Sequence, residues 1–252
     1  MQRLVSLAPS ATSTIQALGA ADRLVGVTAH DDVEGTPAVG GWLSPDLDRL
    51  DGLAPDLVLT ADPLQRDVRD AVEERGHASF HHEPATLADV LEGFEAVGEA
   101  VGLADAGAAL SGDARARIDR VDAATPDEPA DRPVVYCEEW PDPPMAAGNW
   151  VPEAVEAAGG RYPFADPGAR SAEVGREAVV DADPEHVVIH HCGIGERASA
   201  DVAERWGLDA AVHVVDDSLL NQPSPRLVDG IELLAERFHG IPRSPSPLGL
   251  KA

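Results

Sequence analysis

The sequence predicts an α/β protein with two Rossmann-like lobes, each built on a parallel-type sheet, joined by a single long backbone helix. Three observations predict this fold class. Short apolar runs alternate with helical patterns from the first residues, the middle of the chain is purely helical, and the second half repeats the order of the first. A chain of 252 residues is long enough for two lobes of about 110 residues each.

In the first lobe, strands and helices alternate. The expected elements are a strand at 4–8, a helix through 15–18, a strand at 23–28, a short helix at 47–53, a strand at 56–60, a helix at 64–75 and a strand leading to His81 and His82. Gly19 and Gly76 mark the ends of helices, and Pro55 favours an extended backbone before the next strand. This order indicates parallel βαβ units.

A helical stretch follows the first lobe. Apolar residues recur at helical spacing from Leu87 to Val101, and a second helical run covers Asp105–Val121. The most loop-like segment of the chain, TPDEPADRP, comes next at 125–133. We therefore expect an N-terminal lobe at 1–102, a linking backbone helix at 103–124 and a C-terminal lobe at 125–252.

The second lobe repeats the logic of the first. Its expected elements are a strand at 134–140, a helix at 151–158, a short helix and strand ending at His190, a helix near 196–206, a strand at 211–215 and a helix at 225–238. A sequence pattern that occurs once in each half supports the two-lobe prediction. Asp48 lies seven residues before Pro55, and Glu177 lies seven residues before Pro184, each ahead of a buried strand.

The composition excludes several classes of function. The chain carries 45 acidic and 19 basic residues, a net charge of −26, which repels nucleic acid and anionic membranes. Dense carboxylates stay hydrated in high salt, where repulsion is screened, so the composition is typical of a halophilic host. The two cysteines form no disulfide framework or CxxC metal site, and no apolar run approaches the ~20 residues that span a bilayer. Without a recognisable signal peptide, the protein is expected in the cytoplasm; an extracytoplasmic location is the alternative if the true N-terminus lies upstream.

The segment EEWPDPPMAAGNWVPEAVEAAGG, at 138–160, is the most informative in the chain. It holds two of the four tryptophans and four of the 21 prolines in a loop that runs into a helix. Such a loop, with few charges, favours a shaped apolar surface over a solvated connector. It is more typical of a ligand wall than of a catalytic centre.

Four motifs in order resemble the vitamin B12 (cobalamin)-binding proteins of ABC importers, within the helical-backbone metal receptor superfamily of periplasmic-binding-protein-like proteins. They are RLVSLAPSATSTIQALGAADRLVGVT, SPDLDRLDGLAPDLVLT, MAAGNWVPEAVEAAGG and SPRLVDGIELLAERF, and together they cover nearly the whole chain. The resemblance implies a non-catalytic substrate-binding protein that holds a corrinoid in a cleft between two lobes. It also implies no cofactor of its own, and we expect a monomer.

The resemblance carries the ligand-binding residues over one at a time. Trp42 matches a cleft tryptophan, His30 falls where the family often has a cleft aromatic, and Met145 falls where a side chain faces the corrin. The full expected set is Ser10, His30, Trp42, Glu139, Trp140, Met145, Asn149, Trp150 and Cys192. The family's pocket aromatics are replaced by small residues at Ala61 and Ala172, which leaves the identity of the ligand more open than the fold.

Asp48 and Glu177 match the family's paired acidic residues, one on each lobe, which meet arginines on the membrane permease. Two charges placed in this way would register both lobes on the partner. The alternative is that they are two exposed acids among 45.

Other chemistry in the sequence gives weaker predictions. Neighbouring residues of a strand point to opposite faces, so His190, His191 and Cys192 could converge on one metal only if the loop bends, and Glu138 and Glu139 diverge rather than form a catalytic pair. An axial histidine, His30 or His191, to the metal of a bound ligand remains open, as does a contribution from His81 and His82. We find no GxSxG, P-loop or GxGxxG motif after a strand. The alternatives are a ferric-siderophore or heme binding protein and a cytosolic corrinoid carrier or salvage enzyme.

Overall fold

The computed structural model describes residues 1–197 and 199–244. The chain forms two α/β units. Of the described residues, unit 1 comprises Met1–Pro84 and Leu91–Gly112, and unit 2 comprises Ala85–Val90 and those from Asp113 to Ser244. The division falls inside α5 (Ala104–Asp122), so that helix belongs in part to each unit. The segment limits 1–102, 103–124 and 125–252 remain a prediction.

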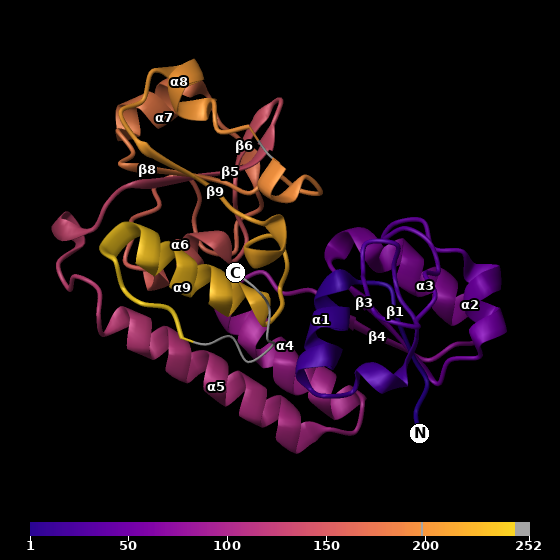
Figure 1. Cartoon of the computed structure of the whole chain (residues 1–252). Coiled ribbons are helices and arrows are strands. Elements are labelled where there is room, and N and C mark those ends of the chain that lie inside the picture. Colours follow the sequence, from indigo (N-terminus) through magenta and orange to yellow (C-terminus); the bar gives the residue numbers. More distant parts are fainter. Residues whose placement is uncertain (198, 245–252) are drawn as a thin grey trace. The chain divides into compact units, whose positions relative to one another are not determined.

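Unit 1 is built on a four-stranded parallel sheet with the strand order β2-β1-β3-β4 (Figure 1). Its strands are β1 (Leu4–Ser6), β2 (Leu24–Gly26), β3 (Leu57–Ala61) and β4 (Ser79–His82). Its helices are α1 (Pro9–Ala17), α2 (Leu47–Leu53) and α3 (Arg66–Glu74), together with most of α4 (Leu87–Ala100) and the first half of α5. These bounds confirm the predicted βαβ order.

Two apolar layers cover the faces of this sheet. Because successive side chains of a strand point to opposite faces, Leu57 and Leu59 pack on one side and Val58 on the other. The first layer is completed from α1, α4 and α5, and the second from α2 and α3. The central strands β1 and β3 are therefore buried on both sides. In open α/β sheets of this kind, ligand sites form at the carboxyl ends of the strands.

Unit 2 has a five-stranded mixed sheet with the strand order β7-β6-β5-β8-β9. Its strands are β5 (Val135–Pro141), β6 (Pro144–Ala146), β7 (Ala172–Glu173), β8 (His186–Ile189) and β9 (Ala211–Val214). Its helices are α6 (Val151–Ala157), α7 (Arg176–Ala182), α8 (Val202–Trp206) and α9 (Arg226–His239). One face of the sheet packs on α7 and α8, while α6 and α9 lie together beneath the other face (Figure 1).

The hairpin of β5 and β6 departs from the prediction. The proline-rich segment was expected to be a loop, but Pro144–Ala146 pairs antiparallel with β5, and β7 continues the pairing. Proline removes a backbone donor, so the segment reads as a loop in the sequence, but short strands towards the edge of a sheet tolerate it. The parallel core of unit 2 is therefore β5-β8-β9, with two antiparallel strands on one side.

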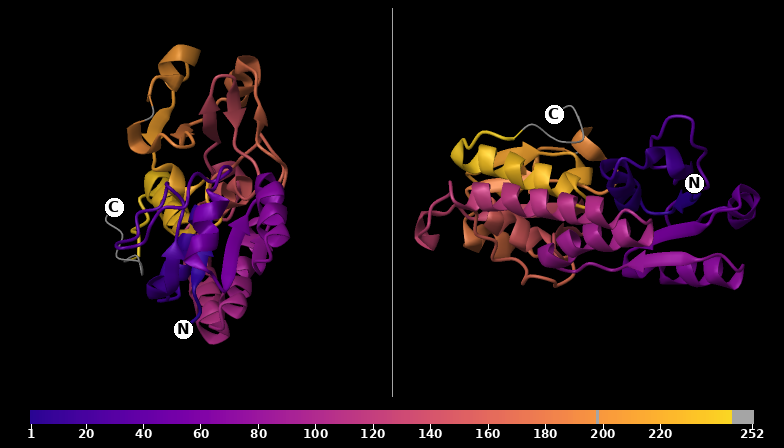
Figure 2. Two further views of the ribbon diagram at one scale, coloured as in Figure 1. Left: turned by 90° about the vertical axis from the view of Figure 1, so that its right-hand side faces the viewer. Right: turned by 90° about the horizontal axis from the view of Figure 1, so that it is seen from below.

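A buried ion-pair cluster joins α5 to α9, which run side by side (Figure 2). Arg117 of α5 is 5% exposed and donates to Glu232 at 2.8 and 3.2 Å and to Asp229 at 2.6 Å. Burial acts to lower the pKa of Arg117, but hydrogen bonds to the two carboxylates raise it overall. The second half of α5 is thus fixed to unit 2. Among the described residues, no helix is long and apolar enough to cross a membrane.

Candidate functional site

The loop after β2 places Trp42 at the carboxyl edge of the unit 1 sheet. Its tip is a tight turn in which the amides of Gly41 and Ser44 each donate to the other residue's carbonyl at 3.2 Å. Gly40 has a φ of +110°, and a Cβ there would lie 2.8 Å from the carbonyl oxygen of Ser44, so only glycine fits. Trp42 is partly buried, and the next residue, Leu43, is 51% exposed.

His30 and Ser10 lie at the same edge with different exposure. His30 is exposed in a turn where Thr28 donates to the Asp31 carboxylate from its amide at 3.1 Å and from its hydroxyl at 2.6 Å. Burial raises the pKa of Asp31. Ser10 is in the first turn of α1 and is only 7% exposed. His30 is therefore accessible to a ligand, whereas Ser10 offers little surface.

The β5–β6 hairpin carries three of the predicted residues of unit 2. Trp140 and Met145 are directly opposed across the two strands, which puts both side chains on one face. Trp140 is 44% exposed, and its indole N–H donates to the carbonyl of Asp142 at 3.1 Å. Glu139 accepts a hydrogen bond from the Ser171 hydroxyl, whose oxygen accepts in turn from the amide of Gly148 at 3.0 Å. The hairpin thus presents an apolar surface with a carboxylate held beside it.

Trp150 does not share this exposure. It is 5% exposed, and its indole N–H donates to the carbonyl of Leu220 at 2.7 Å. This places it in the core of unit 2, which favours a packing role over ligand contact. Asn149, in contrast, is partly buried with a φ of +53°, and its carbonyl accepts from the amide of Gly168 at 3.0 Å.

The histidines after β8 point to different partners. His191 is bonded to the fully buried Glu138 at 3.0 Å. His190 is fully buried, and its Nδ1 faces the side-chain oxygen of Asn221, whose amide nitrogen donates to the His190 carbonyl at 3.0 Å. Nδ1 therefore donates, and Nε2 carries the lone pair without a hydrogen-bond partner among the described residues. Burial lowers the pKa of His190, so the ring is neutral.

Cys192, the third residue of this group, is exposed. Although the residue as a whole is exposed, its thiol is partly shielded from water, and this burial together with the nearby carboxylates of Asp217 and Glu139 raises its pKa, which keeps the thiol protonated near pH 7. Among the described residues, no three or more His, Cys, Asp and Glu side chains are arranged to hold a metal ion.

His81 and His82, whose contribution to a ligand metal was left open, lie in a different part of their sheet from His190 and His191. Both lie within β4, whereas His190 and His191 follow β8, and β8 corresponds to β3 in sheet order. Both ring nitrogens of His81 are engaged, with the Thr60 hydroxyl and with Glu83, each at 2.8 Å. Arg66 lowers the pKa of Glu83 to about 2. His81 therefore has no nitrogen left for a ligand.

Asp48 and Glu177 lie in equivalent local structures. Each is in the first turn of a seven-residue helix, α2 or α7, that ends in a left-handed residue: Ala54 with a φ of +45° and Asp183 with a φ of +49°. A proline and the central parallel strand of the unit follow in both cases. Asp48 pairs with Arg75 at 2.7 Å while its side chain stays 89% exposed, and Glu177 is exposed.

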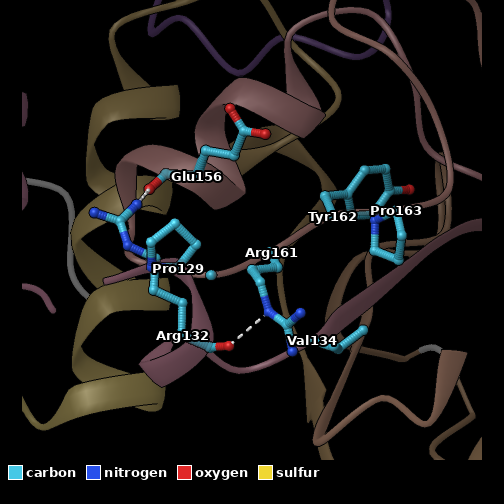
Figure 3. Close-up of a pocket in the computed structure, with 8 residues that line it drawn as sticks. Pro129, Arg132, Val134, Glu156, Arg161, Tyr162 and Pro163 are labelled. Atoms are coloured by element: carbon cyan, nitrogen blue, oxygen red, sulfur yellow. Dashed lines mark hydrogen bonds between the residues drawn. The ribbon is translucent and has the colours of Figure 1, made fainter. Parts of the chain in front are cut away.

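Unit 2 also contains a pocket of about 380 Å3 that holds none of the predicted residues (Figure 3). It lies near Val134, at the amino end of β5, whereas Glu139 and Trp140 lie at its carboxyl end. Two arginines line it. Arg132 donates to the carbonyls of Pro126 at 2.7 Å and Glu156 at 3.2 Å, and Arg161 donates to the Arg132 carbonyl at 2.9 Å. These bonds tie backbone segments together, which gives the arginines a structural role.

Three residues at the unit 1 edge escaped the sequence prediction. Leu43 and Leu64 are 51% and 58% exposed, although leucines in such positions read as core residues. Gln65 is fully buried, although glutamine at the start of a helix reads as a solvent-facing residue. The motif WLSP around Leu43 is the one signal that could have pointed to an exposed apolar turn.

The comparisons with known proteins begin with a family model for periplasmic binding proteins, which matches residues 4–205. The chain belongs to this family. A cobalamin-binding protein of Halobacterium salinarum is 30% identical over 94% of this chain and 69% of its own length. An uncharacterized ABC transporter substrate-binding lipoprotein of Bacillus subtilis is 26% identical over 94% of this chain and 80% of its own length.

Solved structures of the family share the fold. The periplasmic vitamin B12-binding protein of Vibrio cholerae matches with a TM-score of 0.73 and 23% identity, covering 94% of this chain and 96% of its own. The periplasmic heme-binding protein of the same organism matches with a TM-score of 0.80 and 18% identity, covering 94% and 99%. The α/β fold class and the resemblance to B12-binding proteins are therefore confirmed.

Members of this family are solute-binding proteins that carry a ligand rather than a cofactor. This periplasmic binding protein is accordingly a substrate-binding protein for a small molecule. Its relatives do not support the expected cytoplasmic location, because they are named as periplasmic proteins and as a lipoprotein.

Proposed function

We propose that this protein is a non-catalytic receptor for a corrinoid, cobalamin in the first place, and that it serves ABC-type import outside the cytoplasmic membrane. The observation that carries the proposal is the 30% identity to a cobalamin-binding protein over 94% of the chain. The extracytoplasmic site of action follows the names of the relatives.

The exposed edges of the units support this ligand class. Unit 1 offers Trp42, Leu43 and Leu64, and unit 2 offers Trp140 and Met145. A corrin is a wide, partly apolar plate edged with amides. Aromatic and aliphatic side chains supply contact area at low entropy cost, while neutral polar groups meet the amides.

A catalytic role in corrinoid salvage is the less favoured reading. The Cys192 thiol is held protonated, and His190 and His191 bond to separate partners rather than to a nucleophile. Incubating the purified protein with cyanocobalamin and analysing the mixture by chromatography tests this directly. Stoichiometric retention of unchanged cyanocobalamin is expected, and formation of a modified corrinoid would contradict a receptor role.

Heme or a ferric chelate is the second candidate ligand, and His190 is the observation that favours it. Among the described residues its Nε2 has no hydrogen-bond partner, and the ring is oriented through Nδ1 by Asn221, as in metal-bound histidines. Because the ring is fully buried, a metal would reach Nε2 only after neighbouring side chains move. Titration with hemin tests this candidate, with His190→Gln as the variant because its amide can still donate to Asn221. A Soret shift in the wild type that His190→Gln abolishes would support heme. If the spectra of wild type and His190→Gln with hemin are identical, His190 is not the iron ligand and the observation that favours heme is removed.

We also propose that Asp48 and Glu177 dock on the permease. Their equivalent positions on α2 and α7 support this, since basic side chains of a partner could contact a carboxylate in the first turn of the same kind of helix on each unit. The ion pair of Asp48 with Arg75 would have to open or be shared on docking.

A further inference from the structure

The buried side chain of Gln65 is unusual for its place in the chain. Gln65 ends the 3₁₀ turn η2 (Pro63–Gln65) and is the N-cap residue of α3, where a polar side chain commonly caps the helix. It makes no such cap and turns inward instead, fully buried at the carboxyl edge of the unit 1 sheet. A buried amide needs partners, and its partners define what it does.

The amide of Gln65 joins three separate segments of backbone. Its oxygen accepts from the amide of Ala61, the last residue of β3, at 2.8 Å. Its nitrogen donates to the carbonyl of Leu7, just after β1, at 2.7 Å, and to the carbonyl of Trp42 at 2.6 Å. Because one neighbour is a donor and two are acceptors, only this amide orientation satisfies all three.

The third bond reaches the exposed apolar turn. The turn closes on itself through Gly41 and Ser44, and its base is held by the bond from the Asp46 amide to the Val39 carbonyl at 2.7 Å. Trp42 lies within this turn, and Gln65 ties its carbonyl to the ends of the central strands β1 and β3. Leu64, the neighbour of Gln65, is itself 58% exposed, so one buried amide holds two exposed apolar segments in register.

We propose that Gln65 is a positioning residue for the exposed turn that carries Trp42. Through its hydrogen bonds to Leu7, Ala61 and Trp42, it fixes this turn before a ligand binds. The inference rests on the proposed corrinoid function and goes beyond it, because Gln65 itself touches no ligand. A turn fixed in advance loses less conformational entropy when a large flat ligand binds.

The test uses the full chain and three variants. Gln65→Met keeps the length and removes all three bonds, and Gln65→Glu keeps the shape but turns an oxygen towards two carbonyls. Ser111→Ala is the matched control, because the buried Ser111 hydroxyl donates to the Leu91 carbonyl at 2.9 Å in the same unit, away from the turn. Two quantities are measured: amide hydrogen exchange of residues 39–46 without ligand, and affinity for cyanocobalamin.

Gln65→Met should speed exchange in residues 39–46 and weaken cyanocobalamin binding about ten-fold, with a larger loss for Gln65→Glu. Ser111→Ala should change neither quantity. In a Trp42→Ala background, Gln65→Met should weaken binding by less than about two-fold, since the side chain that it positions is gone. A merely structural glutamine would instead give the same loss in both backgrounds.

The outcomes separate the inference from the function on which it rests. The positioning role would be overturned if Gln65→Met left hydrogen exchange in residues 39–46 unchanged. It would also be overturned if the losses of cyanocobalamin affinity from Gln65→Met and Trp42→Ala were additive. Either result would leave the receptor function standing. If the wild-type protein binds no corrinoid, the proposed function is wrong, and so is the claim that Gln65 prepares the turn for a corrinoid. Hydrogen exchange in residues 39–46 would then still show whether Gln65 holds the turn.

Discussion

Replacing Arg117 with methionine should destabilise unit 2 by about 3 kcal/mol near neutral pH. The variant leaves Glu232, 4% exposed, without the guanidinium that donates to both of its oxygens. Removing one partner of a buried pair costs about 3–5 kcal/mol. We expect the lower end, because Arg120 remains 3.6 Å from Glu232 and the Ser244 amide still donates to it at 3.2 Å.

The loss should depend on pH with a definite sign. Burial acts to raise the pKa of Glu232, but hydrogen bonds from Arg117 and Ser244 lower it overall, below its ordinary value of 4.5. A lowered pKa in the folded state contributes stability that is present above 4.5 and is lost as pH falls through the folded value. The difference between wild type and Arg117→Met should therefore shrink in acid.

Urea unfolding followed by the fluorescence of Trp150 and Trp206, both buried in unit 2, measures this loss. Arg120→Met is the matched control one turn along α5, because Arg120 is 58% exposed and its pair should contribute less than about 1 kcal/mol. The reasoning fails if Arg117→Met costs no more than Arg120→Met, or if the difference between wild type and Arg117→Met grows in acid.

Two further predictions concern the site. Trp140→Ala should weaken cyanocobalamin binding about ten-fold without lowering stability because the indole is 44% exposed, whereas Trp150→Ala should cost about 3–5 kcal/mol of unfolding free energy because that indole is 5% exposed. Titration and urea unfolding check both, and equal effects of the two substitutions on either quantity would contradict the assignment. Reversing charge at Asp48 and Glu177 should reduce permease-dependent corrinoid uptake at least about ten-fold while leaving ligand affinity within about two-fold. Uptake that persists unchanged in vesicles containing the permease would exclude docking through these helices.

Sequence periodicity was sufficient for the parallel core of both units. The run Leu57–Ala61 is buried on both faces, and the helices before β3 and β8 end just before a proline, so β3, β8 and their preceding helices could be predicted within a residue or two. The strand β6 could not, because its prolines make a short strand next to the sheet edge read as a loop. The equivalence of α2 and α7 was visible as a repeated spacing of acid and proline.

The site could be predicted less completely, because periodicity does not say which way a loop residue faces. Trp140 and Trp150 both lie in the segment 138–160, yet one is exposed on a hairpin and the other hydrogen-bonds inside unit 2. The histidines after β8 were expected to diverge, and the structure adds their partners, Glu138 and Asn221. Nothing in the sequence marks Gln65, since its role depends on three backbone segments that only the fold brings together.

Isothermal titration of the purified protein with cyanocobalamin, cobinamide and a ferric chelate tests the central claim most directly. The proposed function predicts saturable one-to-one binding of cyanocobalamin, tighter than that of the ferric chelate. Tighter binding of the ferric chelate, or no binding of either corrinoid, would contradict it.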